Sequence, residues 1–160
     1  MIRAIFLDVD GTLISFSTHE IPASALRALA QAHERGVRLF IATGRAANDL
    51  GPLEGIPYDG VVSLNGARCV ANDGRVVSLH PIPRADFERA LALSEEQGFA
   101  MGLELEEGVF VNRVTPDVER VAHMVAHPVP EQTDLRELFG RVECCQLCFY
   151  FDAETQRRVM

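Results

Sequence analysis

The sequence predicts an α/β fold: a doubly wound parallel sheet followed by a second, smaller α/β unit. Three runs, at residues 2–7, 37–42 and 60–64, are mainly apolar rather than alternating, which is typical of strands buried in a parallel sheet. Helical periodicity separates the first two runs, and a short helix at residues 46–50 is expected before the third. This alternation of strands and helices favours parallel strands joined by right-handed crossovers.

The first helix is expected to begin at Pro22, because proline is favoured in the first helical turn. Leu26, Leu29 and Ala30 recur at helical spacing, which places them on one face. Gly36 is expected to end the helix, since glycine readily adopts the left-handed conformation found there.

After the third strand the pattern changes. Two short runs, 67–71 and 75–79, flank an Asn-Asp-Gly turn and predict a β-hairpin. A linker with two prolines follows. We therefore expect two units, residues 1–80 and residues 81–160.

The second unit is expected to mix helices and strands. Its expected elements are a helix at 86–97, a hairpin of strands 101–105 and 109–113, a helix that begins at Thr115 and Pro116, a strand at 142–151 and a helix that begins at Asp152. Because the sequence predicts only three parallel strands, we expect a truncated core. Its third strand, carrying Val61, Val62 and Leu64, is then expected to have an unpaired edge that needs cover.

The composition limits the classes of function. The 160 residues are 48% hydrophobic, which predicts a soluble globular protein, and the formal net charge of −8 argues against nucleic acid and anionic membranes as partners. No apolar run approaches the length of a membrane span or a signal-peptide core. We expect a cytoplasmic protein with reduced cysteines. The sequence does not indicate the oligomeric state.

Three of the four cysteines, Cys144, Cys145 and Cys148, fall in one expected strand. Because side chains alternate along a strand, Cys145 and Cys148 would point to opposite faces and could not bind one metal ion together. A zinc site would also need a tight turn and a second ligand pair. We interpret these residues as buried structural thiols rather than a metal cluster.

Polar residues gather where the three parallel strands end, the edge at which open sheets bind ligands. They are Asp8 and Asp10 after the first strand, Thr43, Gly44 and Arg45 after the second, and Ser63, Asn65 and Gly66 after the third. Each is common in loops, but their joint placement favours a binding site.

Asp8 and Asp10 would project to the same side of an extended segment. Two carboxylates so close repel each other unless a cation or a proton intervenes, and hard oxygen ligands suit Mg²⁺. With the cation bound, one carboxylate can attack phosphorus while the other transfers protons. Gly11 permits a tight turn, and Thr12 can hydrogen-bond it. A solvated Asp-Gly turn without chemistry is the alternative interpretation.

Residues 8–13, Asp-Val-Asp-Gly-Thr-Leu, resemble the first motif of the haloacid dehalogenase-like (HAD) hydrolase superfamily. Residues 40–45, Phe-Ile-Ala-Thr-Gly-Arg, resemble its second motif. Residues 65–67, Asn-Gly-Ala, followed by a hairpin and an α/β insert, resemble its Cof-type subgroup with a class IIB cap. The resemblance implies that residues 1–80 are the N-terminal part of a Rossmann-like core, incomplete here, and that residues 81–160 are a truncated α/β cap domain.

The resemblance also implies roles for single residues. Asp8 is the nucleophile that forms an aspartyl-phosphate, and it is a ligand of Mg²⁺. Asp10 protonates the leaving oxygen, then activates water, and its main-chain carbonyl contacts the metal. Thr43 hydrogen-bonds a phosphoryl oxygen, with help from the main chains of Val9 and Gly44. Within the family, an aspartate at position 10 points to phosphatases or phosphomutases.

Arg45 and Asn65 are the candidate substrate-binding residues. A guanidinium suits a second phosphate or a sugar, but Arg45 could equally stabilise its own loop, and both interpretations remain open. His19 follows the first motif and is interpreted as a surface residue rather than a substrate contact.

Two motifs of the family are absent. All 15 basic residues are arginine, so the lysine of the third motif is missing, and no Gly-Asp dipeptide of the fourth motif occurs. The favoured function is a Mg²⁺-dependent phosphatase (a phosphoric monoester hydrolase) of small phosphorylated metabolites such as sugar phosphates, with this chain alone inactive. A phosphomutase, or a non-catalytic module that binds a phosphorylated ligand or a partner chain, is the alternative. The sequence does not identify the substrate.

Overall fold

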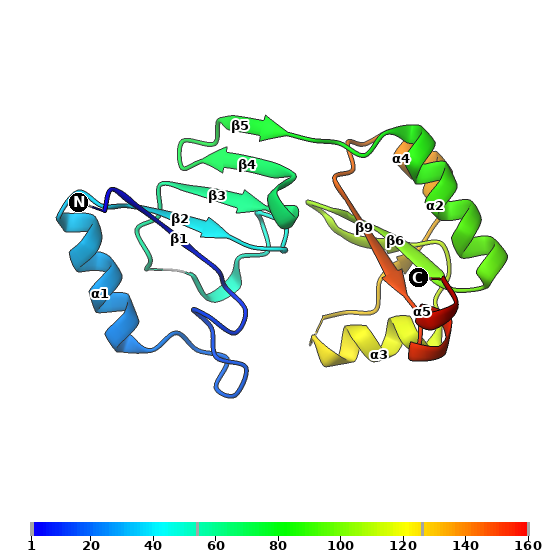
Figure 1. Cartoon of the computed structure of the whole chain (residues 1–160), viewed down its shortest axis with the longest axis horizontal. Helices are drawn as coiled ribbons and strands as arrows, with labels where there is room; N and C mark the ends of the chain where they lie inside the picture. The colour runs from blue at the N-terminus through cyan, green and yellow to red at the C-terminus, as the bar shows by residue number, and fades with distance from the viewer. Residues whose placement is uncertain (1, 54, 126, 160) are drawn as a thin grey trace. The chain divides into compact units, whose positions relative to one another are not determined.

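The structure is a computed structural model that describes residues 2–53, 55–125 and 127–159. The chain divides into two compact units, Met1–His80 and Pro81–Met160. Each unit has its own sheet and its own hydrophobic core (Figure 1).

The first unit is built on a five-stranded sheet in the order β1-β2-β3-β4-β5. The strands are β1 (Ala4–Leu7), β2 (Arg38–Ala42), β3 (Gly60–Ser63), β4 (Arg68–Ala71) and β5 (Val76–Leu79). β1, β2 and β3 are parallel, whereas β4 and β5 form the hairpin and run antiparallel to their neighbours. The α/β class with parallel strands is confirmed.

Two expectations for this unit are wrong. The third strand has no unpaired edge, because the hairpin folds back and β4 pairs antiparallel with β3. Among the described strands, the edges of the sheet belong to β1 and β5. The helix expected at 46–50 is a turn, followed by the 3-10 helix η1 (Gly51–Leu53). Gly51 has a φ of 47°, a conformation that ends a helix.

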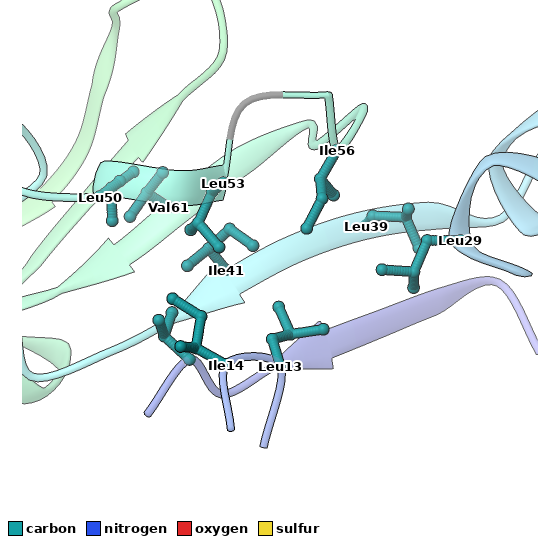
Figure 2. Close-up of a cluster of buried hydrophobic side chains, with 10 residues drawn as sticks. Leu13, Ile14, Leu29, Leu39, Ile41, Leu50, Leu53, Ile56 and Val61 are labelled. Carbon is teal, nitrogen blue, oxygen red and sulfur yellow. The ribbon is translucent and has the colours of Figure 1, made fainter. Parts of the chain in front are cut away.

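The core of the first unit lies on one face of the sheet. Helix α1 (Ala23–Glu34) begins after Pro22 and packs there through Leu29. Figure 2 shows Leu29 beside Leu39 of β2, with side chains from the loops on either side. The cluster comprises Val9, Leu13, Ile14, Leu29, Leu39, Ile41, Leu50, Leu53, Ile56 and Val61. Its loop members anchor the segments that follow β1 and β2.

On the same sheet, β1 and β2 also carry a pair of stacked aromatic rings. Phe6 and Phe40 occupy paired positions, with ring centroids 5.0 Å apart. Phe6 is nevertheless 62% exposed. Because parallel sheets are usually buried on both faces, this apolar surface is unusual for the strands that carry it.

The second unit has a four-stranded sheet in the order β8-β7-β6-β9. Its elements are α2 (Arg84–Gln97), β6 (Ala100–Leu105), β7 (Gly108–Val111), α3 (Pro116–Met124), β8 (Glu131–Gln132), α4 (Leu135–Phe139), β9 (Gln146–Tyr150) and α5 (Ala153–Val159). The expected hairpin and the helices that follow Thr115 and Asp152 are confirmed. The strands pair β6 with both β7 and β9. β8 and α4 were not predicted, and β9 begins four residues later than expected.

A buried polar network joins α2 to the hairpin of the second unit. Ser94 Oγ donates to the Phe99 carbonyl at 2.8 Å and accepts from Asn112 Nδ2 at 3.1 Å. Asn112 Oδ1 in turn accepts the N–H of the fully buried Met101 at 2.9 Å. The network satisfies polar groups that burial would otherwise leave unpaired.

The cysteines of the second unit are thiols, and the prediction that they are buried holds for Cys144 alone, since Cys145 and Cys148 are only partly buried. Cys144 precedes β9 and is 1% exposed. Burial raises the pKa of Cys144 to about 11, and burial next to the Glu104 carboxylate raises the pKa of Cys148 to about 12. Cys145 also lies before β9, so the expected alternation of Cys145 and Cys148 on one strand is wrong.

No described helix is both long and apolar enough to cross a membrane.

Candidate active site

The loop after β1 carries Asp8 and Asp10 on an anchored turn. The Val9 carbonyl accepts the N–H of Ile14 at 2.9 Å, and Gly11 N–H donates to the Ile14 carbonyl at 2.8 Å. Gly11 has a φ of 81°, which glycine adopts without steric cost. Ile14 is buried and ties the turn to the core. Both aspartates are therefore exposed on a loop whose base is fixed.

Asp8 is held by one neutral donor. Thr12 Oγ1 donates to Asp8 Oδ2 at 2.7 Å. Within the described chain, neither the second Asp8 oxygen nor the Asp10 main-chain carbonyl has a hydrogen-bond donor. These are hard oxygen ligands of the kind Mg²⁺ prefers, so they fit the expected metal. No group of three or more acidic, histidine or cysteine side chains in the described ranges could complete such a site.

Asp10 has a charged partner. Arg45 donates from Nε to Asp10 Oδ2 at 3.0 Å and from Nη2 to Asp10 Oδ1 at 2.7 Å. These hydrogen bonds hold the pKa of Asp10 below its ordinary value, and the same pairing raises the pKa of Arg45. The Asp10 side chain is still 43% exposed. The two motifs, on neighbouring strands, are thereby joined by a bidentate ion pair.

Arg45 is itself fixed at three points. Its N–H donates to Thr43 Oγ1 at 3.1 Å, and its carbonyl accepts the N–H of Leu64 at 3.1 Å. Its third guanidinium nitrogen, Nη1, donates to the Asp49 carbonyl at 3.3 Å. The loop after β2 and the turn after β3 thus set where the guanidinium lies.

Thr43 stands at the end of β2 and is 6% exposed. Its N–H donates to the Val62 carbonyl at 2.9 Å, and its carbonyl accepts the Asn65 N–H at 3.2 Å. Because Thr43 Oγ1 accepts from the Arg45 N–H, the hydroxyl proton remains to be donated elsewhere. A phosphoryl oxygen at the strand end is a suitable acceptor.

The turn after β3 has an unusual backbone. In η2 (Leu64–Gly66), Leu64 has a φ of 49° and Asn65 a φ of 53°. Asparagine tolerates this left-handed region, whereas leucine rarely occupies it. A Cβ on Gly44 would stand 3.1 Å from Asn65 Oδ1. The turn therefore brings the Asn65 amide against the main chain that follows Thr43.

The structure brings most of the sequence-predicted site residues into contact. Asp10 meets Arg45, Arg45 meets Thr43, and Gly44 lies against Asn65. Asp8 contacts Thr12 instead. Val9 is fully buried, so only its main chain is available at the site. His19 is exposed, with a φ of 54°.

Sequence reasoning missed Leu64 and Asp49, which position Arg45 through main-chain atoms. Their contacts are a hydrogen bond from Leu64 N–H and one to the Asp49 carbonyl. Main-chain contacts of this kind leave no signature in residue type. The polar sequence after each strand was the only available signal.

The site's motifs and their arrangement agree with a known family. The family model for haloacid dehalogenase-like hydrolases matches residues 5–159. The chain belongs to this family. Its relatives place it in the Cof-type subgroup of the HAD superfamily.

Two solved structures show how much of a HAD protein this chain represents. BT1666 from Bacteroides thetaiotaomicron, a HAD phosphatase, is 54% identical with a TM-score of 0.93; the alignment covers 100% of this chain and 60% of BT1666. The HAD subclass IIB sugar phosphatase BT4131 is 29% identical with a TM-score of 0.83, covering 98% of this chain and 62% of BT4131. The chain thus spans about 60% of the length of these phosphatases.

A curated relative is also described as a phosphatase. It is YkrA of Bacillus subtilis (strain 168), which is 30% identical to this chain over 95 residues. The match covers 59% of this chain and 36% of YkrA.

Proposed function

We propose that the protein is a phosphatase, a phosphoric monoester hydrolase in which Asp8 attacks phosphorus. The observation that carries this proposal is that Asp8 and Asp10, on one anchored loop, have hydrogen-bond partners of different charge. Asp8 has a single neutral donor, Thr12, which leaves its second oxygen available as a nucleophile. Asp10 is bound by the Arg45 guanidinium, which favours a separate role in proton transfer.

The proposed reaction has two steps. An Asp8 oxygen attacks phosphorus and forms an aspartyl-phosphate, while the leaving oxygen takes a proton from Asp10, which is in its protonated form for this step. Asp10 then removes a proton from water, whose oxygen attacks the same phosphorus, so that phosphate leaves and Asp8 is regenerated. The Thr43 hydroxyl and the main-chain N–H groups of Val9 and Gly44 would hold the phosphoryl oxygens.

The Asp8 carboxylate and the Asp10 main-chain carbonyl would hold Mg²⁺. When bound, the metal offsets the negative charge of the phosphate and of the two carboxylates. Further ligands would have to come from outside the described residues, since these supply no third acidic group.

Residues 1–80 are proposed to be the N-terminal part of the catalytic core, and residues 81–160 the truncated cap. For the whole protein we propose small phosphorylated metabolites such as sugar phosphates as substrates, supported by the likeness to the sugar phosphatase BT4131. A cytoplasmic location is also part of the proposal, and there the four cysteines would stay reduced.

The proposal is tested in the protein produced from its complete gene, with Mg²⁺ and a generic aryl phosphate. Asp8→Asn should abolish turnover, because an amide is a poor nucleophile toward phosphorus. Asp10→Asn should lower the rate by about 10²- to 10⁴-fold through lost proton transfer. Asp117→Asn, which alters an exposed ion pair with Arg120 on α3, is the control. An Asp8→Asn variant that turns over near the wild-type rate would exclude the aspartyl-phosphate mechanism.

A further inference from the structure

We propose that Arg45 is a positioning residue that acts through Asp10: it fixes the Asp10 carboxylate for proton transfer, so that its Nε–Nη2 edge is not a substrate contact. The inference rests on the proposed function and assigns a role that the sequence left open between substrate binding and loop support.

The geometry of the ion pair carries the first step. Arg45 Nε and Nη2 donate to different oxygens of Asp10, at 3.0 and 2.7 Å. Two parallel hydrogen bonds from a planar fork fix both the direction and the rotation of a carboxylate, which a single bond does not. The Asp10 side chain is 43% exposed, so without this partner it would be free to sample several rotamers.

The second step is that Arg45 is held in place before any substrate arrives. Its main chain is bonded on both sides, to Thr43 Oγ1 and to the Leu64 N–H. Its guanidinium is bonded to the Asp49 carbonyl. A residue so constrained can orient its partner at little further entropic cost, which is the condition for effective proton transfer.

The third step concerns the donors that remain. Three of the five guanidinium N–H groups of Arg45 already donate, two to Asp10 and one to Asp49. A phosphate that took the Nε–Nη2 edge of the guanidinium would have to displace the carboxylate from its bidentate partner. It would then leave Asp10, an anion, without its cation next to an anionic ligand. The arrangement therefore favours Arg45 as the support of Asp10.

A kinetic double-mutant cycle tests this role in the protein produced from its complete gene. Arg45→Met, Asp10→Asn and the double variant are compared on an alkyl phosphate (glucose 6-phosphate) and on an aryl phosphate (p-nitrophenyl phosphate). Arg45→Met should lower kcat/KM for the alkyl phosphate by about 10²-fold. The loss should be smaller for the aryl phosphate, whose leaving group needs less help from an acid. Arg27→Met, which removes an exposed arginine of α1, is the control for charge.

In the Asp10→Asn background, Arg45→Met should cost almost nothing more, because residues that act as a unit are non-additive. Additive losses, or a raised KM with unchanged kcat, would mean that Arg45 contacts the substrate and would overturn the inference. A wild-type protein that hydrolyses no phosphate ester would instead overturn the proposed function, and the inference with it.

A spectroscopic arm measures the contact without turnover. In arginine labelled with nitrogen-15, the Arg45 Nε–H resonance, identified by its loss in Arg45→Met, should shift in Asp10→Asn. It should not shift in Asp117→Asn, whose arginine partner is Arg120. If the Arg45 resonance does not shift in Asp10→Asn, the ion pair does not form in solution, and this result would overturn the positioning role.

Discussion

A methyl group on Gly44 would stand 3.1 Å from Asn65 Oδ1 and 3.3 Å from Asn65 Nδ2, closer than ordinary van der Waals contact. The Asn65 side chain, in the turn after β3, therefore lies against the main chain that is proposed to bind phosphate. A Cβ at position 44 would displace this amide by a few tenths of an ångström.

Gly44→Ala should lower kcat/KM of the full-length enzyme by about tenfold, because small misplacements of binding groups are costly in catalysis. The melting temperature should change little. Gly140→Ala is the control: Gly140 has an ordinary φ of −71°, and its nearest contact would be 3.4 Å away. Unchanged activity in Gly44→Ala would show that the approach of Asn65 is incidental.

Metal binding by the 160-residue chain should be weak. Asp8 and the Asp10 carbonyl supply two oxygen ligands, and no third acidic group accompanies them in the described ranges. Isothermal titration with Mg²⁺ should give little heat of binding. Asp8→Asn should remove this heat, whereas the control Asp73→Asn, in the β4–β5 turn, should leave it unchanged. Tight, stoichiometric binding by this chain would contradict the expected ligand set.

Cys144 and Cys148 should resist alkylation in the folded protein at pH 8. Burial raises the pKa of Cys144 to about 11 and, together with Glu104, the pKa of Cys148 to about 12, from an ordinary value of 9.0. Only the thiolate reacts quickly. Iodoacetamide followed by mass spectrometry should find both residues labelled in urea and unlabelled in buffer. Equal labelling in the two conditions would show that these thiols are accessible.

The same pKa values predict an alkaline loss of stability. Above about pH 9 the unfolded chain releases thiol protons that the folded chain retains, so the free energy of unfolding decreases as the pH rises. Below pH 8 these thiols should contribute no pH dependence. Urea unfolding at a series of pH values, with Cys148→Ala for comparison, measures the effect. An equal slope in Cys148→Ala would assign the loss to other groups.

Asn112→Ala should destabilise the second unit by about 1–3 kcal/mol, because it leaves the buried Met101 N–H without its side-chain acceptor. Urea unfolding followed by circular dichroism measures the change. Asn72→Ala, at an exposed position in the β4–β5 turn, is the control and should stay within about 0.5 kcal/mol of the wild type. Equal effects of the two substitutions would rule out the network as the cause.

The 160-residue chain alone should be inactive and should self-associate. Phe6 stacks on Phe40 and is 62% exposed on a face of the sheet, and exposed apolar surface of this kind favours association with other chains. Phe6→Ser should reduce light scattering, whereas Met124→Ser, 71% exposed at the end of α3, should not. A monomeric and fully active 160-residue chain would contradict both expectations.

The parallel strands were predictable because short, mainly apolar runs alternate with helical periodicity. Burial of the first strand was wrongly predicted, because no residue of β1 is buried and Phe6 is 62% exposed. The helix expected at residues 46–50 does not form. The apolar residues there belong to a loop, in which Leu50 and Leu53 lie on either side of a turn at Gly51 and both pack into the core. The edge of β3 was misjudged for a related reason. The hairpin was recognised, but local sequence does not say which strand it will pair with.

The residue types of the candidate site could be predicted, but their pairing could not. Leu7 pairs with Ile41, and this register brings the two motifs side by side at the strand ends. The sequence predicts neighbouring strands but not which side chains meet. The choice of Asp10 over Asp8 as the partner of Arg45 depends on how each loop turns. In the second unit, β8 and α4 are too short for periodicity to reveal them.

The left-handed turn at Leu64 and Asn65 sets a trade-off between stability and activity. Backbone strain of this kind costs about 1–3 kcal/mol per residue, and glycine would relieve it at Asn65, which is exposed. Such a substitution would remove the amide that lies against Gly44. A laboratory selection for heat resistance alone would therefore favour glycine at position 65, and the selected variants would be more stable but would lose part of the proposed activity.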